Sequence, residues 1–447
     1  MGGKRQKALL PVLGTPIIRH ITLATDTVKP KKTFAVVGFD SDSMVQYLSN
    51  NGTGNFEFAY QREQRGTGHA LSSAMKKISA RDGEVVVVNG DIPGVTGTLI
   101  KKLVANRKKK GAALSFVTAI ADNPDGYGRV VRSKNGDPEK IVEHRDASVK
   151  EKRIDEINAG IYCFKISFLR RALALLNKKN AKGEYYITDL VEIALRTGER
   201  TGTVKTADFN EITGVNTPSE LAAAQKYMRE RTNARLMSAG VIIADPSTTY
   251  ICPETKIRKG ALIQPCCFIN RSFIGTNCVI EPCSQITNSK LGADCRVEFS
   301  SILDSCDMRA GSAAGPFARI RPETVLMEGA RAGSFVEIKK SLVGKNSKIP
   351  HLSYVGDSAL GAHVNIGAGT ITCNYDGNKK HRTIIGDEVF IGSDTILVAP
   401  VKVDKGASTA AGSVITKNVS PRSLAIGRSK QKEVRGWRKP GDKAAKN

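Results

Sequence analysis

The sequence predicts two dissimilar domains, an α/β domain followed by a parallel β-helix, joined by one connecting helix. Three observations lead to this prediction. Apolar runs alternate with helical stretches in the first half, a capped helix begins near residue 217, and a six-residue aliphatic period fills most of the second half. We therefore divide the chain into residues 1–217, 218–240 and 241–447.

Three apolar runs predict the sheet of the first domain. Thr33–Phe39, Glu84–Val88 and Ala112–Thr118 are too apolar for strands with one solvated face. They suit a parallel sheet that is covered on both faces, as in doubly wound α/β folds. Ligands of such sheets lie beyond the carboxyl ends of the strands, which is where Asn89–Asp91 would follow the second run.

The connecting helix is predicted from its first turn. Thr217 is placed to act as the N-cap, Pro218 suits the first helical position, and Glu220 is placed to complete a capping box. Gly240 is a natural stop for this helix. A helix of this kind marks the boundary between the two domains.

An aliphatic residue recurs at every sixth position of the second half, and the side chain four positions later is usually small. This pattern is the hexapeptide repeat of a parallel β-helix, in which the aliphatic side chain points inward. The period breaks at His381–Thr383, so residues 373–380 are predicted to leave the coil and to line a binding face. The longest series is Ile385, Ile391, Leu397, Val403, Thr409 and Ile415.

The composition restricts the class of protein. The chain has 68 Lys and Arg against 43 Asp and Glu, a net charge of +25 that suits anionic partners. With 6% aromatic residues and no base-stacking motif, nucleic-acid binding is the weaker account of this charge. No apolar run approaches the 18 or so residues of a membrane span. The nine cysteines contain no C-x-x-C, and several fall in small-residue positions of the repeat, so we expect a reduced, cytoplasmic protein without structural zinc.

Four strings of residues stand out along the chain. They are Gln61-x-Glu63-Gln64-x-Gly66-Thr67-Gly68-His69-Ala70, Gly126-Tyr127-Gly128-Arg129, Gly183-Glu184-Tyr185-Tyr186-Ile187-Thr188-Asp189 and Asn374-Tyr375-Asp376-Gly377. On these strings the sequence resembles, over nearly its whole length, the family of bifunctional N-acetylglucosamine-1-phosphate uridylyltransferases / glucosamine-1-phosphate N-acetyltransferases. The resemblance implies a Rossmann-like nucleotidyltransferase domain, a linker helix and a left-handed parallel β-helix.

Acetyl transfer to a sugar amine needs a base that works near neutral pH, and histidine is the natural one. By resemblance that base is His351, although Pro350 stands where the family usually has a small residue. The residues implied for glucosamine 1-phosphate are Arg321, Lys339, Tyr354 and Asn365, and those implied for acetyl-CoA are Ala368, Asn374, Tyr375, Ser393, Ala411 and Arg428. The resemblance also implies a homotrimer whose acetyltransferase sites form between subunits.

Uridylyl transfer brings two polyanions together, so it needs Mg²⁺ and cationic side chains on the phosphates. By resemblance the Mg²⁺ ligands are Asp91 and Asn216, whose oxygens suit this ion. The residues implied for UTP are Lys7, Gln61, Gly66 and Thr67, and those implied for N-acetylglucosamine 1-phosphate are Gly128, Glu143, Asn158 and Asn216.

The sequence departs from the family at its beginning. The family opens with an apolar strand and an Ala-Ala-Gly-x-Gly-Thr-Arg loop, whereas this chain begins Met1–Lys7 and resumes the pattern at Ala8–Pro16. Loss of that central strand would remove sheet pairing and phosphate donors. Two explanations stay open, a true start further upstream or weak UTP binding, and we favour the first.

Three functions follow from the sequence. The favoured one is a bifunctional enzyme that makes UDP-N-acetylglucosamine from glucosamine 1-phosphate, acetyl-CoA and UTP. An enzyme with acetyltransferase activity alone is the first alternative. A regulatory nucleotide-exchange subunit of the same domain plan is the second. Such a protein has no reason to carry together Lys339, His351, Tyr354, Asn374-Tyr375 and Arg428.

Overall fold

The computed structural model describes residues 6–38, 41–51 and 56–437. Phe39 and Met1–Arg5, the first five residues of the segment that departs from the family, therefore lie outside the described residues. The chain forms two compact units, which divide at Met228 within the long helix α8 (Pro218–Ser238). None of the described helices has the length and apolarity needed to cross a membrane.

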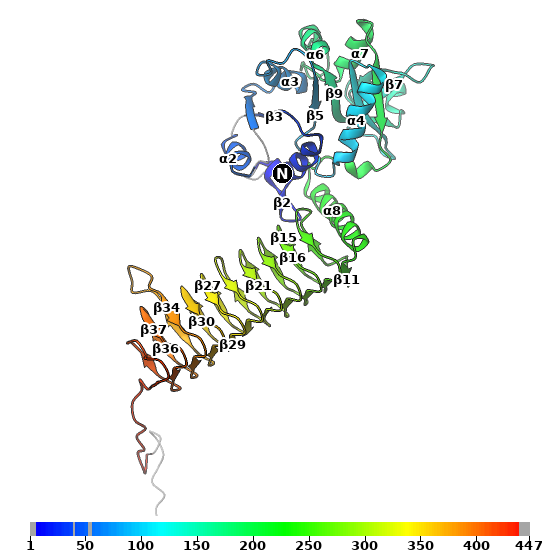
Figure 1. Ribbon diagram of the computed structural model, residues 1–447. Helices are drawn as coiled ribbons and strands as arrows, with labels where there is room; N and C mark the ends of the chain where they lie inside the picture. The colour runs from blue at the N-terminus through cyan, green and yellow to red at the C-terminus, as the bar shows by residue number, and fades with distance from the viewer. Residues whose placement is uncertain (1–5, 39–40, 52–55, 438–447) are drawn as a thin grey trace, which may run out of the picture. The chain divides into compact units, whose positions relative to one another are not determined.

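The first unit is an α/β domain built on a six-stranded mixed sheet (Figure 1). The sheet's path runs β10 (Thr201–Lys205), β6 (Leu114–Ile120), β9 (Glu156–Lys165), β7 (Arg129–Arg132) and β8 (Pro138–Val142), with β5 (Glu84–Val87) also paired to β9. Its helices are α1 (Ile17–Thr25), α2 (Asp42–Asn51), α3 (Thr67–Met75), α4 (Gly97–Lys110), α5 (Val149–Lys152), α6 (Ile166–Ala172) and α7 (Asp189–Arg196). Short 3-10 turns are η1 (Lys7–Leu9), η2 (Asp26–Val28), η3 (Leu173–Leu175) and η4 (Phe209–Glu211).

The sheet differs in one respect from the expected parallel, fully covered sheet. Strands β5 and β6 run parallel to each other, but β9 lies between them in the opposite direction. Residues 114–119 of β6 are buried, as predicted, whereas most of β5 is only half-buried. Coverage on both faces therefore holds for the middle of the sheet and not for β5.

Two strand pairs stand apart from the six-stranded sheet. Strands β3 (Thr33–Val37) and β4 (Phe56–Tyr60) form a parallel pair, and β1 (Pro11–Val12) pairs with β2 (Thr15–Pro16). Among the described strands, β3 pairs only with β4 and β5 only with β9. The described sheet is thus divided between β3 and β5, and Figure 1 shows β3 separated from the group around β9. The predicted loss of a central strand stays a prediction.

Helix α8 begins as the sequence predicts. The Glu220 carboxylate accepts hydrogen bonds from the N–H groups of Asn216 at 2.7 Å and Thr217 at 2.8 Å. In return, the Thr217 hydroxyl accepts from the Glu220 N–H at 3.2 Å. The capping box is therefore confirmed. Further along, the Asn233 amide donates to the carbonyls of Pro246 and Thr249, which fixes the end of α8 to the first coil of the second unit.

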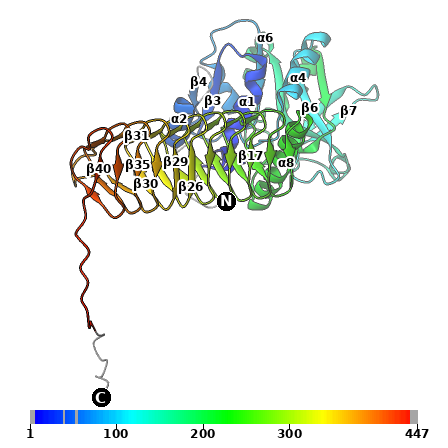
Figure 2. The same ribbon diagram turned by 60° about the horizontal axis from the view of Figure 1, so that its bottom comes forward.

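The second unit is a parallel β-solenoid of about ten coils, consistent with the predicted left-handed β-helix (Figures 1 and 2). Its three faces are parallel sheets of 11, 10 and 9 strands. The first face holds β11 (Ile242–Ile243), β14 (Leu262–Ile263), β17 (Val279–Ile280), β20 (Arg296–Val297), β23 (Ala313–Ala314), β26 (Arg331–Ser334), β29 (Lys348–His351), β32 (Asn365–Ile366), β35 (Phe390–Ile391), β38 (Ser408–Thr409) and β40 (Leu424–Ala425).

The other two faces complete each coil. The second face holds β12 (Tyr250–Ile251), β15 (Phe268–Asn270), β18 (Gln285–Thr287), β21 (Ile302–Asp304), β24 (Arg319–Ile320), β27 (Glu337–Lys339), β30 (Tyr354–Gly356), β33 (Ile371–Cys373), β36 (Ile396–Val398) and β39 (Val414–Ile415). The third face holds β13 (Lys256–Ile257), β16 (Phe273–Ile274), β19 (Lys290–Leu291), β22 (Asp307–Met308), β25 (Val325–Leu326), β28 (Leu342–Val343), β31 (Ser358–Leu360), β34 (Thr383–Ile385) and β37 (Val401–Val403).

The hexapeptide interpretation is confirmed residue by residue. The aliphatic residues of the series form one continuous core along the solenoid, and Ile269, Ile320 and Ile391 are fully buried in it. The predicted small-residue positions, such as Cys278 and Ser347, are buried as well. The excursion is also present, since residues 374–382 leave the coil between β33 and β34.

Candidate active sites

A cation-binding cluster forms where the sequence places the metal ligands of the first unit. The Lys7 ammonium donates to Asp91 Oδ2 at 2.7 Å and to Asn216 Oδ1 at 2.8 Å. Asp91 follows β5, and its carbonyl accepts from the Val215 N–H at 2.9 Å, which brings the two loops together. Lys7, expected on a phosphate, thus lies between the two expected metal ligands.

Tyr127, which the sequence analysis quoted without assigning it a role, is affected by the charge of this cluster. Burial raises the pKa of its hydroxyl, and the carboxylates of Glu220 and Asp91 raise it further. Its ring meets Phe209 edge-on, with 5.9 Å between the centroids. The Asp91 carboxylate of this cluster therefore disfavours the ionised form of the Tyr127 hydroxyl.

The residues expected to bind uracil are held by a clamp between two distant motifs. The Gln61 side chain donates to the Gly66 carbonyl at 3.0 Å. Two main-chain hydrogen bonds of 2.8 Å each join residues 65–68 to Tyr185, and the Thr67 hydroxyl accepts from the Ile187 N–H at 3.1 Å. The structure thus brings together two motifs that lie 120 residues apart.

The residues expected to bind the sugar lie next to this clamp. The Thr188 hydroxyl donates to Glu143 Oε1 at 3.1 Å, and the Asn158 N–H donates to the Gly128 carbonyl at 2.9 Å. The Asn158 amide also donates to the hydroxyl of Tyr162 at 2.6 Å. Burial raises the pKa of Glu143. Since Thr188 belongs to the same motif as Tyr185, the expected uracil and sugar residues share one scaffold.

In the second unit, the solenoid register aligns the expected base with three expected cofactor residues. Lys348 pairs with Asn365, and Ile391 pairs with both Ile366 and Thr409. Counting forward from these pairs aligns one residue on each of four successive coils, about 4.8 Å apart. We call this set the His351 column; it consists of His351, Ala368, Ser393 and Ala411.

The His351 column is bordered by close main-chain contacts. A Cβ on Gly367 would lie 2.4 Å from the Ser393 nitrogen, and one on Gly392 would lie 2.6 Å from the Ala411 nitrogen. At the far end, the Arg428 guanidinium donates to the Ala411 carbonyl at 2.7 Å. The register also continues through Pro350, because Ser334 still pairs with His351.

The expected sugar-phosphate residues are divided between two faces of the solenoid. Tyr354 and Lys339 lie on the second face, where Lys339 pairs with Gly356. The Tyr354 hydroxyl and the Asn374 amide both approach this glycine, since a Cβ on it would lie 2.5 and 2.8 Å from them. Asn365 lies on the first face.

Two residues expected in the second site, Arg321 and Tyr375, are not part of the contacts described so far. Arg321 follows β24 and forms an ion pair with Glu337 at 2.7 Å. Tyr375, on the excursion, is 60% exposed. The excursion itself is held by Asp376, which accepts from His381 at 2.6 Å and from the N–H groups of Asn378 and Lys379.

Lys380 is a candidate for the second site to which the sequence analysis gave no role. The neighbouring Lys339 lowers the pKa of Lys380. Two neighbouring cations favour an anion such as a phosphate. The position of Lys380 in the predicted excursion was the sequence signal that could have identified this residue.

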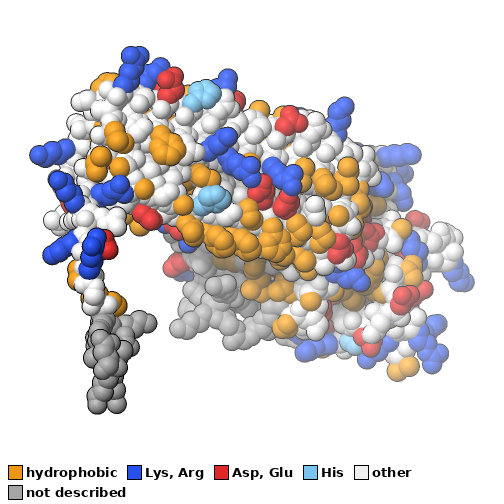
Figure 3. Space-filling view, turned by 90° about the horizontal axis from the view of Figure 1, so that it is seen from below, with side chains coloured by type: hydrophobic (Ala, Val, Ile, Leu, Met, Phe, Trp, Pro, Cys, Tyr) orange, Lys and Arg blue, Asp and Glu red, His pale blue; other side chains and the backbone are white. Residues whose placement is uncertain are grey.

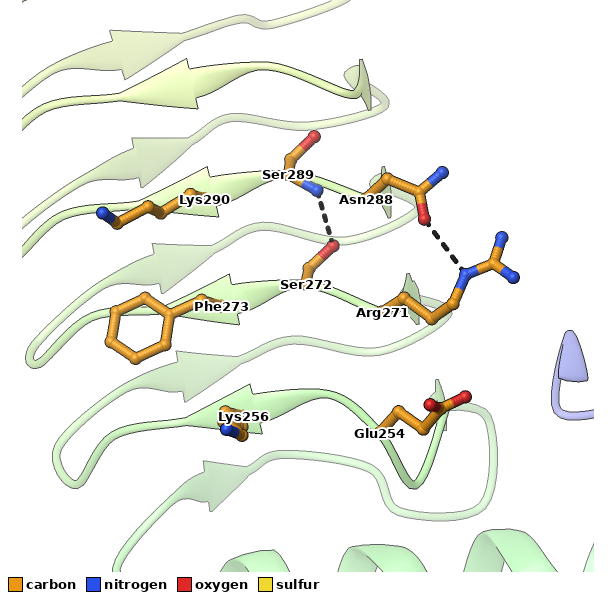
Figure 4. A pocket seen from close by; sticks show the side chains of 8 residues that line it. All are labelled: Glu254, Lys256, Arg271, Ser272, Phe273, Asn288, Ser289 and Lys290. Carbon is orange, nitrogen blue, oxygen red and sulfur yellow. Dashed lines mark hydrogen bonds between the residues drawn. The ribbon is translucent and has the colours of Figure 1, made fainter. Parts of the chain in front are cut away.

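A shallow hollow of about 680 Å³ lies over the first coils of the solenoid (Figure 4). Figure 4 shows the Ser289 N–H bonded to the Ser272 hydroxyl and the Arg271 guanidinium bonded to Asn288, and each of these bonds joins one coil to the next. None of its lining residues belongs to the expected sites. They are Glu254, Lys256, Arg271, Ser272, Phe273, Asn288, Ser289 and Lys290.

Replacing Gly66 tests the clamp. Gly66 has a φ of +102°, and a Cβ there would lie 2.5 Å from the Tyr185 carbonyl oxygen. We expect Gly66→Ala to open the contact with Tyr185 and lower the thermal stability of the first unit by several degrees. Gly183→Ala is the matched control, since Gly183 also has a positive φ but no atom within 4 Å of its Cβ position. Equal melting temperatures for the two variants would contradict the clamp.

Asp189 gives the first unit a pH-dependent stability. Burial, followed by Glu192, Glu143 and Asp146, raises the pKa of Asp189 to about 6. The unfolded chain loses this proton near pH 4, so the free energy of unfolding falls as the pH rises from about 4 to about 6. We expect the melting temperature of Asp189→Asn to be higher than that of the wild type at pH 8 and equal to it at pH 4.

The control for this pH dependence is Asp82→Asn, which removes one negative charge from an exposed loop. This variant should follow the wild-type melting temperature across the same range. A wild-type minus Asp189→Asn difference that does not change between pH 4 and 8 would contradict the assignment.

Known proteins are similar to this chain over both units. A model of the nucleotidyl transferase family matches residues 2–230. Three relatives are each named "Bifunctional protein GlmU". The protein from Exiguobacterium sp. is 42% identical over 442 residues (98% of this chain, 96% of the relative), that from Shouchella clausii 42% over 432 residues (96% and 94%), and that from Trichlorobacter lovleyi 39% over 441 residues (98% and 95%). The chain therefore belongs to the nucleotidyl transferase family and, over nearly its whole length, to the family of bifunctional GlmU proteins.

Proposed function

We propose that this chain makes UDP-N-acetylglucosamine in two steps, acetyl transfer to glucosamine 1-phosphate and uridylyl transfer from UTP to the product. The observation that carries the proposal is the His351 column. A histidine heads a row of small side chains that ends at a cation, Arg428, and the row runs along a rigid solenoid. The regulatory nucleotide-exchange alternative gives no reason for such a row.

In the first step, His351 accepts a proton from the sugar amine as the amine nitrogen attacks the thioester carbonyl. The new C–N bond replaces the C–S bond, and coenzyme A leaves as the thiolate. Small side chains at Ala368, Ser393 and Ala411 let the extended thioester arm lie close to the main chain. In this proposal Lys339 binds the phosphate of the sugar, and the neighbouring Lys380 adds a second positive charge there.

In the second step, Asp91 and Asn216 would hold Mg²⁺, which would neutralise charge on the phosphates. The donor set fits, because two oxygen atoms already converge on one cation, the Lys7 ammonium. Among the described residues no group of three or more His, Cys, Asp and Glu side chains forms a metal site. Water and phosphate oxygens would therefore complete the coordination, as is usual for Mg²⁺. The Glu220 carboxylate orients Asn216 by accepting a hydrogen bond from the Asn216 main-chain N–H.

We also propose a homotrimer, supported by an apolar band along the solenoid (Figure 3). Phe317, Phe335 and Leu352 are 44%, 58% and 63% exposed, and the rings of Phe317 and Phe335 stack with 5.1 Å between centroids. Exposed apolar patches of this kind mark interaction surfaces. Leu352 follows His351 directly, so a second copy on this band would border the His351 column.

The expected location is the cytoplasm, and it stays a proposal. Its support is the cysteine pattern of the sequence, because the nine cysteines contain no C-x-x-C and several occupy small-residue positions of the repeat.

Reciprocal variants test the assignment of two activities to two sites. We expect His351→Ala to lower acetyl transfer at least about 100-fold because the amine loses its base, and to leave uridylyl transfer unchanged. Asp91→Ala should do the reverse. The two reactions are measured separately, with coenzyme A release for the first and pyrophosphate release for the second.

Two outcomes would contradict this division. An equal loss of both activities in His351→Ala would mean that the histidine supports the fold and not the reaction. Wild-type protein that releases coenzyme A but no pyrophosphate would favour the alternative of an acetyltransferase alone.

A charged side chain in the apolar band tests the trimer. We expect Phe335→Asp to convert trimers into monomers in sedimentation equilibrium, because an interface cannot bury an unpaired carboxylate cheaply. The matched control is Leu342→Asp, a similar change at a 39% exposed residue on the third face. A wild-type monomer, or a trimer that survives Phe335→Asp, would contradict the proposed interface.

A further inference from the structure

Lys7 contacts the two residues that are proposed to bind the metal of the first unit. The Lys7 ammonium makes hydrogen bonds of 2.7 Å to Asp91 Oδ2 and 2.8 Å to Asn216 Oδ1. These contacts span 84 and 209 positions of the chain, so they are a product of the fold. The two oxygens are also the ones proposed to bind Mg²⁺.

The lysine and a divalent ion cannot both use these oxygens. Mg²⁺ binds oxygen at about 2.0–2.1 Å, so it would have to sit within the space that the ammonium nitrogen takes at 2.7 to 2.8 Å. An ammonium has three hydrogen-bond donors and no acceptor, so it cannot itself act as a ligand of the metal. A single positive charge next to a divalent cation is also strongly repelled.

We propose that Lys7 is the resident cation of this site and that a divalent ion must displace it. The displaced ammonium needs a new anionic partner, and the triphosphate that arrives with the metal is one. Metal and nucleotide would therefore bind as a pair, and a free divalent ion would bind weakly. This inference rests on the proposed function, which assigns Asp91 and Asn216 to the metal.

Free Mn²⁺, added without nucleotide and followed by electron paramagnetic resonance, tests the displacement. We expect Lys7→Met to bind Mn²⁺ about 5-fold to 10-fold more tightly than the wild type, since the ion no longer competes with the ammonium. The matched control is Lys32→Met. Lys32 is also paired with a carboxylate, Glu57 at 2.5 Å, so its loss changes the net charge equally. Its Mn²⁺ affinity should equal that of the wild type.

The possible results separate this inference from the proposed function. Mn²⁺ binding that Asp91→Asn abolishes but Lys7→Met leaves unchanged overturns the inference alone. An equal gain in Lys7→Met and Lys32→Met also overturns it, because net charge would then explain both. If neither the wild type nor Lys7→Met binds Mn²⁺ through Asp91, the metal assignment and the inference both fail.

A second measurement uses the unaltered protein. Amine-directed acetylation, read residue by residue with mass spectrometry, reports how freely each lysine reacts. Saturating Mg²⁺ alone should raise the labelling of Lys7, and UTP added with the Mg²⁺ should lower it again, while Lys32 stays constant. Lys7 labelling that Mg²⁺ lowers or leaves unchanged would overturn the displacement.

Discussion

The coil register of the solenoid is the constraint on which the acetyltransferase half depends. Each coil repeats its backbone path, so residues at one position of successive coils stack about 4.8 Å apart. That spacing converts four residues scattered over 61 positions into the His351 column. The register is kept by buried aliphatic side chains and by glycines such as Gly367, where no Cβ fits against the next coil. The proposed acetyl-transfer site is thus a product of the stacking of the coils.

The nucleotidyltransferase half follows a different principle, in which loops at the ends of strands are tied to one another. The motif that contains Tyr185 and Thr188 contacts both the expected uracil residues and the expected sugar residues. The capping box of α8 serves the fold and the site at once, since the same Glu220 that begins the helix also holds Asn216.

The sequence predicted the solenoid nearly completely because its repeat is local. A residue's place in the hexapeptide determines whether it points inward, and register then fixes its neighbours. The α/β half was less predictable, because pairing between distant strands decides it. The antiparallel β9 between β5 and β6, and the separation of β3 from β5, have no signature in the apolar runs. The contacts of Lys7 with Asp91 and Asn216 likewise depend on side chains that only the fold brings together.

We propose above all that acetyl transfer takes place along the His351 column. The most direct test is an experimental structure of the protein with coenzyme A and glucosamine 1-phosphate bound. The account predicts that the thiol-bearing arm lies along Ala368, Ser393 and Ala411, with the sugar amine within hydrogen-bonding distance of the His351 imidazole and the phosphate near Lys339 and Lys380. A cofactor bound on the third face, or a sugar amine out of reach of His351, would contradict it.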